Sequence, residues 1–393
     1  MTVVRPVRGD ELEAMLVLMC RAFGLPIAPA RQLFFEDPYF DPAKKRVLER
    51  DGRIVSCLTL TASLVRLGAA VVPVTGIAGV ATRPEEQRRG YASRLLLDTA
   101  AELAASAAGL LALVADSPMF YERLGWRSCG SHARVVIPAA SVRKVGGTAT
   151  TRKAAEDDVP HLARIHAATV GHRDGSTVRD TRRWRYLLRY IQGVEVWPAR
   201  GEPEGYIVLE TRTESGSAVR ARVLEVAATT EDARASLWAH AARAARTGDV
   251  VWVADPLRFA AELPPGAPEN LAVALEARVM YRVADFRAAL AALAPNFHRL
   301  GGRILLACDD PMLSRRTVCE IARGTGGVIA TEVAAGPADV EGDQAVWARV
   351  LMGDVSLQEA AQASLVRASP AATSALEEAL PRRDPFLPPP DHF

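Results

Sequence analysis

Hydrophobic and polar positions in the first part of the chain alternate between the period of a strand and the period of a helix. A strand over residues 3–8 precedes an amphipathic helix that begins at Glu11. Asp51-Gly52 separates two strand-like runs, which is a strong short-range signal for a β-hairpin. Continuous apolar runs at residues 70–80 and 110–115 are typical of buried strands. This order predicts a compact α/β domain that ends near residue 140.

The most informative stretch follows the predicted strand at residues 70–80. Its sequence is Gln87-Arg88-Arg89-Gly90-Tyr91-Ala92, and a helical pattern begins at once. The predicted inner face of that helix consists of Ala92, Leu95, Leu96, Thr99 and Leu103, at spacings i, i+3, i+4, i+7 and i+11. The pattern therefore indicates a strand, a basic turn that contains glycine, and a helix.

A second region with a similar order of elements begins at Thr151, and residues 155–160 lead into its first predicted helix. Strands are predicted over residues 205–209, 220–226 and 250–254, and a further helix over 231–245. No R-x-x-G-x-G/A turn joins a strand to a helix in this region. We therefore expect the architecture of the first region without its basic turn.

Residues 287–393 form a third region of short elements. Strands are predicted over 303–308 and 327–332, and helices over 344–352 and 371–380. The alternation permits a ligand pocket but does not demonstrate one.

The C-terminal tail is rich in proline and ends in an aromatic residue. Its last residues are Pro388-Pro389-Pro390-Asp391-His392-Phe393. Consecutive prolines favour polyproline II, a stiff spacer that rises ~3.1 Å per residue. Such a spacer suggests that Phe393 is delivered to a defined place, and a frayed C-terminus is the alternative.

Composition restricts the class of protein. A length of 393 residues predicts two or three domains, and 49% hydrophobic with 24% charged residues is typical of a soluble globular protein. The formal net charge of +2 argues against a nucleic-acid-binding protein, and no apolar run approaches the ~20 residues of a membrane span. The first residues do not resemble a signal peptide, and the five cysteines are scattered without C-x-x-C. We therefore expect a cytoplasmic protein with reduced thiols and no metal site.

The turn at residues 87–92 has the chemistry of an anion-binding site. Backbone N–H groups and the positive dipole end of a helix attract phosphate, and Gly90 allows the backbone to approach closely. Arg88 and Arg89 can add charge-assisted hydrogen bonds. The alternative is a solvated basic turn that caps an ordinary helix. Hydrolase and nucleotide-loop chemistry is not indicated, because the sequence contains no G-x-S-x-G, H-E-x-x-H or P-loop motif.

These features together resemble the GNAT superfamily of acetyl-CoA-dependent N-acyltransferases. Residues 87–92 fit its Q/R-x-x-G-x-G/A cofactor signature. The length, the second region without a turn and the terminal phenylalanine resemble in particular the Eis (enhanced intracellular survival) family of bacterial acetyltransferases. Its F/I-Y-x-R-x-G-Y/F segment is similar to Phe120-Tyr121-Glu122-Arg123-Leu124-Gly125-Trp126. The resemblance covers essentially the whole chain and implies an α/β (α+β) fold: two tandem GNAT-like domains, 1–145 and 146–288, then a sterol-carrier-protein-like domain, 289–393.

The resemblance also implies which residues form the active site. The residues expected to bind acetyl-CoA are Val80, Ala81 and Thr82 at its pantetheine arm, and Gln87, Arg88, Arg89, Gly90, Tyr91 and Ala92 at its pyrophosphate. Tyr121 would be the general acid that protonates the departing CoA thiolate, and an ordinary tyrosine with a satisfied hydroxyl is the alternative. The α-carboxylate of Phe393 would enter the active site of the first domain as the base.

The acceptor implied by the resemblance is a small-molecule or peptide primary amine, such as an aminoglycoside, a polyamine or a lysine side chain. Glu36 and Asp37 lie where the family places an acceptor-binding lining, although a loop that buries neighbouring phenylalanines would show the same pattern. His392 stands where the family often has an acidic residue, and it could relay a proton or simply be exposed. The resemblance further implies direct attack by the amine, without an acyl-enzyme or a metal, and a homo-hexamer.

Two other functions are compatible with the sequence. A sterol- or lipid-binding protein would use the C-terminal domain, and a titration with a fluorescent sterol would identify it. A protein N-acetyltransferase would modify lysines or N-termini instead of small amines, and the charge of the acceptor cleft would distinguish it.

Overall fold

The computed structural model describes residues 2–37, 39–143, 150–190, 193–213, 219–246 and 248–392. Contacts between Cα atoms divide the chain into two compact units. The first unit contains the chain up to Cys129 together with Arg278–Pro385, and the second contains Gly130–Ala277 together with Phe386–His392. Each unit therefore combines segments that are distant in the sequence.

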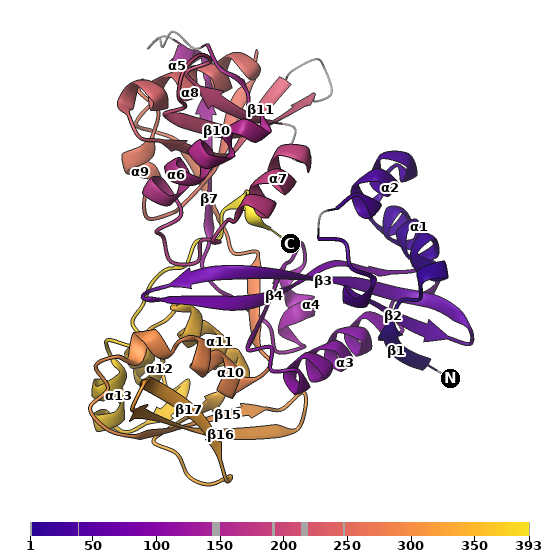
Figure 1. Ribbon diagram of the computed structural model, residues 1–393, viewed down its shortest axis with the longest axis vertical. Coiled ribbons are helices and arrows are strands. Elements are labelled where there is room, and N and C mark those ends of the chain that lie inside the picture. The colour runs from indigo at the N-terminus through magenta and orange to yellow at the C-terminus, as the bar shows by residue number, and fades with distance from the viewer. Residues whose placement is uncertain are drawn as a thin grey trace. The chain divides into compact units, whose positions relative to one another are not determined.

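A seven-stranded mixed sheet forms the N-terminal part of the first unit (Figure 1). Its strands, in spatial order, are β1 (Thr2–Pro6), β2 (Lys45–Arg50), β3 (Arg53–Leu67), β4 (Ala70–Thr82), β5 (Leu110–Val114), β14 (Val279–Val283) and β6 (Arg127–Ser128). Its helices are α1 (Leu12–Phe23), α2 (Ile27–Phe35), α3 (Tyr91–Ala105) and α4 (Pro118–Glu122). The predicted hairpin joins β2 to β3, and its Asp51-Gly52 turn has φ angles of 51° and 80°, both left-handed. The predicted inner face of α3 is confirmed, because Leu95, Leu96 and Leu103 are buried in the core.

The parallel pairing between β4 and β5 is short. It ends at Gly76 opposite Ala112, whereas β4 continues to Thr82. A β-bulge against β3 follows, and Gly79 within it has a φ of 60°. A Cβ at this glycine would lie 2.7 Å from the terminal methyl group of Met19, which would have to move, and the left-handed φ itself favours glycine there. Beyond Gly76 the facing edges of β4 and β5 are free of ladder hydrogen bonds to each other, which leaves room for a site.

The second unit contains a sheet of the same kind. Its strands, in spatial order, are β13 (Ala272–Glu276), β7 (His132–Pro138), β12 (Asp249–Ala254), β11 (Val219–Ala228), β10 (Gly205–Thr213), β9 (Val194–Trp197) and β8 (Arg152–Lys153). Its helices are α5 (Ala139–Arg143), α6 (Val159–Thr169), α7 (Thr181–Tyr190), α8 (Glu231–Ala244) and α9 (Phe259–Glu262). The parallel pairing of β11 with β12 ends at Val223 opposite Trp252, whereas β11 continues to Ala228. The predicted similarity of the two regions is confirmed down to this short parallel pair.

Relative to the predicted ranges 1–145 and 146–288, each sheet contains one strand from the other range. β7 follows the first sheet in the chain but pairs with β12 and β13. β14 follows the second sheet but pairs with β5 and β6. The predicted boundary at 145/146 falls in residues 144–149, outside the described residues, and the limits 1–145, 146–288 and 289–393 stay predictions.

The C-terminal domain packs within the first unit. A five-stranded sheet contains, in spatial order, β17 (Gly327–Val333), β16 (Arg315–Gly324), β15 (Ile304–Asp310), β18 (Val340–Asp343) and β19 (Val366–Ala368). The accompanying helices are α10 (Phe286–Ala292), α11 (Gln344–Met352), α12 (Leu357–Gln362) and α13 (Pro370–Leu376). The helix predicted over 344–352 is confirmed, and Asp343 caps it by accepting from the backbone N–H of Val346 at 2.8 Å.

The tail differs from the predicted spacer. Pro389–Asp391 form a 3₁₀ turn in which the N–H of Asp391 donates to the carbonyl of Pro388 at 2.9 Å, so the triproline is not a continuous polyproline II segment. The turn is stabilised by burial, because the Asp391 side chain is 0% exposed. The frayed alternative is also wrong for residues 386–391, whereas Phe393 lies outside the described residues.

None of the helices in the described part of the chain has the length and apolar character needed to cross a membrane.

Candidate functional site

The turn after β4 has the backbone conformation of an anion cradle. Arg88 has a φ of 61°, and Gly90, the N-cap of α3, has a φ of 79° and supplies no side-chain cap. The first helical hydrogen bond runs from Arg94 N–H to the Gly90 carbonyl at 3.0 Å. The N–H groups before Arg94 therefore point out of the helix end, where the dipole is positive. A Cβ built on Gly90 would meet no heavy atom within 4 Å, so glycine is favoured there by its left-handed φ of 79° and not by crowding.

A cavity of about 550 Å³ opens beside this turn. Most of the residues predicted to bind acetyl-CoA line it: Val80, Thr82, Gln87, Arg88, Gly90, Tyr91 and Ala92. Ala81 and Arg89 are the predicted residues that do not. Ala81 faces the opposite side of β4, since strand side chains alternate, and Arg89 pairs with Glu86 at 3.0 Å.

Arg50, at the end of β2, supports the turn from behind and was not anticipated. Its guanidinium donates to the Tyr91 hydroxyl at 2.8 Å and to the Glu86 carboxylate at 3.3 Å. It thereby fixes Tyr91, the first residue of α3. It also offsets the negative charge of Glu86, the one acidic side chain of the cavity lining among the described residues. Nothing in the local sequence around Arg50 signals this role, because its partners lie more than thirty residues away.

Tyr121 lies on α4, at the far side of the same cavity. Its ring packs edge-on against Phe120 with centroids 4.9 Å apart. Burial raises the pKa of the Tyr121 phenol above its ordinary value of about 10, so the group is protonated at neutral pH. A phenol held in this state can give a proton but is a poor base.

A second cavity of about 340 Å³ adjoins the first. The two share Val80, Phe120 and Tyr121, so the phenol-bearing residue borders both. The second cavity extends along the unpaired part of β4 and carries one acidic side chain among the described residues, Asp116. Asp116 follows β5 and forms an ion pair with Arg278. A carboxylate directly after the buried strand predicted at residues 110–115 is a sequence signal for a site residue, but Asp116 was not among the predicted site residues.

The predicted acceptor residues Glu36 and Asp37 lie elsewhere. Asp37 accepts from the backbone N–H of Tyr39 at 2.7 Å, and Glu36 accepts from the Gln32 side chain at 3.3 Å. Neither lines the two cavities, so the described structure does not bring them together with Tyr121.

His392 lies in the second unit, on the tail. Its ring is edge-on to that of His132 at 5.2 Å, and His132 itself hydrogen-bonds the Leu387 carbonyl at 2.7 Å through Nε2. Phe386 also packs edge-on against His132. These contacts fix the tail on the second unit up to the residue before Phe393.

The strongest anchor of the tail is a buried charge cluster. The Arg179 guanidinium donates to both Glu225 carboxylate oxygens at 2.7 Å and to Asp391 at 2.8–3.0 Å. Burial opposes ionisation of Asp391, but the charges of Arg179 and Arg183 outweigh it and hold the pKa of this carboxyl below its usual value. His166, Glu225 and Asp391 approach one another closely enough to be metal ligands, but Arg179 already occupies the space between the two carboxylates. The cluster is therefore an ion network that holds the tail.

Family models match three parts of the chain. Residues 3–129 and 175–283 each match an acetyltransferase (GNAT) domain, and residues 287–388 match a sterol carrier protein domain. No curated protein sequence matches the chain.

The chain also has the fold of solved acetyltransferase structures. It is similar to a GCN5-related N-acetyltransferase from Anabaena variabilis ATCC 29413, with a TM-score of 0.77 at 16% identity, and to one from Kribbella flavida, with 0.74 at 22%. It is also similar to Eis1 from Mycobacterium abscessus, with a TM-score of 0.69 at 20% identity. Each match covers 100% of both chains. With two GNAT domains, a sterol carrier protein domain and this shared fold, the chain is a GNAT N-acetyltransferase of Eis-like architecture.

Proposed function

We propose that the protein transfers the acetyl group of acetyl-CoA to a primary amine by direct attack. The observation that carries the proposal is the position of Tyr121, which borders both the cavity beside the basic turn and the cavity along β4. A donor in the first cavity and an amine in the second would meet at this residue.

The donor cavity suits coenzyme A in size and in chemistry. The uncapped N-terminus of α3 and the adjacent Arg88 offer hydrogen bonds and positive charge to a pyrophosphate. The free edge of β4 at Val80 and Thr82 offers backbone groups to the amide-bearing pantetheine arm. The cavity of about 550 Å³ falls in the usual range of cofactor sites, about 300–1,000 Å³.

Two proton transfers accompany the acyl transfer. The amine nitrogen forms a bond to the thioester carbon, and the carbon–sulfur bond breaks. In our proposal the Tyr121 phenol gives its proton to the sulfur, and the α-carboxylate of Phe393 accepts the proton that the amine releases. The role of Phe393 is taken from the family resemblance, and the described part of the tail is held on the second unit through Asp391. His392 is a candidate relay in this proposal.

The acceptor is proposed to be an aminoglycoside, a polyamine or a lysine-like amine. Asp116 is the acidic group that the cavity along β4 presents, and a cationic amine would compete with Arg278 for it. Glu36 and Asp37 remain predicted acceptor contacts. The cytoplasmic location and the hexamer remain predictions from the family resemblance.

A sterol-binding function has no comparable support. The described cavity of the C-terminal domain, about 330 Å³, is bordered by Arg299 and Glu378, whose ion pair spans 2.8 Å. A sterol requires a mostly apolar cavity.

The test is a thiol-release assay with acetyl-CoA against aminoglycosides, polyamines and lysine peptides. The Tyr121→Phe variant and a variant without Phe393 are compared with Tyr186→Phe, a control on α7 outside both cavities. We expect release with at least one amine, strong loss in the first two variants and none in the control. Full activity in both active-site variants would refute the mechanism, and ping-pong kinetics would refute direct attack.

A further inference from the structure

The segment that carries Tyr121 is too short to fix its own position. Helix α4 has five residues, and the turn at residues 123–126 follows it directly. Within this segment the Tyr121 carbonyl accepts from the backbone N–H groups of Leu124 at 2.9 Å and of Trp126 at 3.2 Å. A single helical turn is not stable in water on its own, so the place of the phenol depends on what holds the turn after α4.

Two buried side chains from later parts of the chain hold this turn. The Arg282 guanidinium, on β14, donates to the Leu124 carbonyl at 2.7 Å. The Gln344 amide, at the start of α11, donates to the Gly125 carbonyl, also at 2.7 Å. Asp310, at the end of β15, pairs with Arg282 at 2.5 Å and compensates its buried charge. Asp310 and Gln344 belong to the sterol carrier protein domain, and all of these residues lie in the first unit.

Gly125 allows both donors to approach. Its φ is 84°, and a Cβ built on it would overlap the Gln344 amide and the Arg282 guanidinium. Both side chains are buried and hydrogen-bonded, so they could make room only by giving up these hydrogen bonds. The glycine of the segment at residues 120–126 is thus matched to donors from two distant parts of the chain.

Cohesion between the domains does not require these residue types. Burying Arg282 and Asp310 removes two charges from water, and well-packed apolar side chains of the same volume often give equal or greater stability. The other residues of β14 are hydrophobic and buried: Val279, Met280, Tyr281 and Val283. What the guanidinium adds to this strand is a directed hydrogen bond to the turn beside Tyr121.

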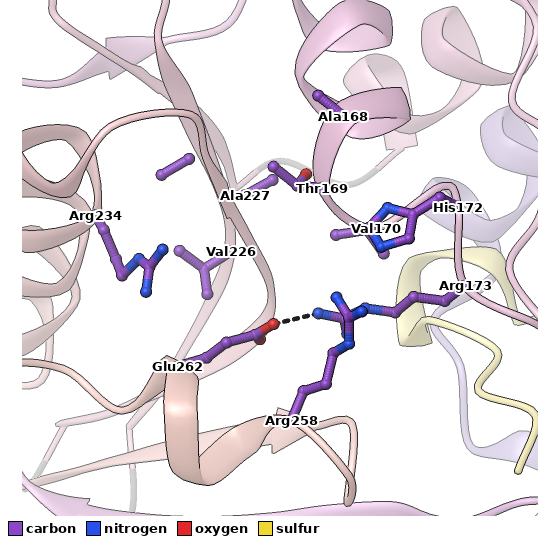
Figure 2. A pocket seen from close by; sticks show the side chains of 11 residues that line it. Ala168, Thr169, Val170, His172, Arg173, Val226, Ala227, Arg234, Arg258 and Glu262 are labelled. Atoms are coloured by element: carbon purple, nitrogen blue, oxygen red, sulfur yellow. Dashed lines mark hydrogen bonds and ion pairs between the residues drawn. The ribbon is translucent and has the colours of Figure 1, made fainter.

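The second unit provides a comparison. There α9 follows β12 as α4 follows β5, and it borders a cavity of about 180 Å³ (Figure 2). Glu262, the last residue of α9, accepts from Arg173 of the same unit, and Figure 2 shows these two side chains pointing toward each other. A side chain therefore holds α9 from within its own unit. The turn after α4 is held through its backbone carbonyls, partly by the C-terminal domain.

We propose that Arg282 and Gln344, with Asp310 behind Arg282, are positioning residues through which the C-terminal domain sets the place of Tyr121. This inference rests on the proposed function, because it takes Tyr121 as the proton donor. A general acid works only within hydrogen-bond reach of the leaving group, and a displacement of about 1 Å can cost about 100-fold in rate. Neither Arg282 nor Gln344 lines the two cavities, so both act through the turn after α4 and not by contact with a substrate.

The test uses Gln344→Met in the full-length protein, which removes the hydrogen-bond donor and keeps the volume. The matched control is Asn296→Leu, because Asn296 is also buried and its amide donates to a backbone carbonyl of the first sheet, that of Leu67 at the end of β3, at 3.0 Å. The assay is acetyl-CoA thiol release with the amine that gives the fastest turnover. We expect kcat to fall about tenfold or more in Gln344→Met and to change less than about twofold in Asn296→Leu. The dissociation constant of coenzyme A should change less than about threefold, because the turn at residues 87–92 is intact.

A double-mutant cycle with Tyr121→Phe separates positioning from general loosening. If Gln344 acts through the phenol, Gln344→Met should lower kcat by less than about twofold in the Tyr121→Phe background. An equal fold-loss in both backgrounds, or a normal kcat in Gln344→Met, would overturn the positioning role and leave Tyr121 as the acid. Full activity of Tyr121→Phe alone would instead refute the proposed function, and this inference with it.

Hydrogen exchange provides a readout that needs no turnover. The backbone N–H groups of residues 124–126 should exchange about tenfold faster in Gln344→Met than in wild type, and at the wild-type rate in Asn296→Leu. Equal exchange in wild type and Gln344→Met would overturn the proposal whatever the activity. Arg282→Lys keeps the charge beside Asp310 but not the fork that reaches two partners, so we expect a kcat about fivefold lower or less than that. A normal kcat in this variant would remove Arg282 from the positioning residues.

Discussion

The two acetyltransferase domains share a sheet in which a short parallel strand pair leaves space at its end, yet only the first surrounds that space with donor chemistry. In the first unit α3 begins at an uncapped glycine after two arginines. In the second, α8 begins at Thr230, whose hydroxyl caps the helix, followed by two acidic residues. The sheet therefore provides the location, and a few residues at the next helix N-terminus decide which ligand can use it.

The second difference concerns α4 and α9, which occupy equivalent positions. α4 carries Tyr121 beside the donor cavity, whereas the α9 segment carries Arg258 and Glu262. A proton donor for a leaving thiolate is thus present in one unit and replaced by charged groups in the other. We infer that the chain has one acetyl-transfer site.

The largest expected effect comes from Tyr121→Phe, which removes the proton donor but keeps the ring packed on Phe120. We expect kcat to fall by about 10²–10⁴-fold, the usual contribution of a positioned general acid. The dissociation constant of coenzyme A, measured by titration calorimetry, should change little. A normal kcat would show that Tyr121 is not the proton donor, so that the two units would not differ by a general acid.

Asp391→Ala tests the role of buried charge in the second unit. It leaves Arg179 with one carboxylate partner in a fully buried place, so we expect the free energy of unfolding to fall by about 3 kcal/mol or more. Chemical denaturation followed by tryptophan fluorescence measures the loss. Asp384→Asn is the matched control, because asparagine tolerates the left-handed φ of 47° and the lost pair with Arg382 is partly exposed and should contribute less than about 1 kcal/mol. Equal effects of the two substitutions would show that the tail is not anchored by this cluster.

Acid should destabilise the second unit before the first. Burial and the nearby Arg179 lower the pKa of His166 to about 4, from an unfolded value of about 6.5. As the pH falls, the unfolded chain therefore protonates His166 before the folded chain does. The contribution of neutral His166 to the free energy of unfolding is fully present above pH 6.5. It decreases by about 3 kcal/mol as the pH falls to about 4.

Thermal unfolding between pH 7 and pH 4 measures this acid effect, and His166→Gln should flatten the pH dependence. The comparison is informative because the first unit contains one histidine among the described residues, His298, which is exposed. An unchanged pH profile in His166→Gln would assign the acid sensitivity to other groups.

The smallest expected effect is at Gly90. An alanine at its φ of 79° adds strain of about 1 kcal/mol, so the turn relaxes and the dissociation constant of coenzyme A should rise about fivefold. Gly201→Ala is the matched control, because Gly201 also has a left-handed φ, 87°, and open space around its Cβ but lies in the second unit. An equal loss of affinity in both variants would mean that strain alone, and not the position of the turn, affects binding.

Local patterns predicted much of this fold. The Asp51-Gly52 hairpin, the inner face of α3 and the bounds of α11 all follow from residues within a few positions of one another. The same holds for the turn at residues 87–92, whose Arg88 and Gly90 lie close together in the sequence and both line the cavity. These features depend on turn chemistry and helical periodicity, which a single sequence contains.

The features that sequence reasoning missed depend on distant partners. The strands β7 and β14 are ordinary apolar runs, and nothing in them indicates that each pairs across the predicted boundary of its range. The sequence assigned Asp391 no role beyond the stiff proline-rich tail, because its partner Arg179 lies 212 residues away in the chain. Arg50 contacts Tyr91 across 41 residues. In each case the energy comes from a contact whose partner the local pattern does not specify.

The pairing of β14 in the first sheet has a consequence for synthesis of the protein on the ribosome. Within the described residues of the first sheet, β6 pairs with β14 alone, and β5 has β14 on one side, so neither is complete until Val283 has emerged. About 150 residues separate Ser128 from Val279, which corresponds to about 8–30 s of translation at about 5–20 residues per second. During that interval the nascent first domain has an open sheet edge next to the cavities. It therefore completes its active-site scaffold only after the second domain has been made, and a chaperone that covers such edges would act in this window.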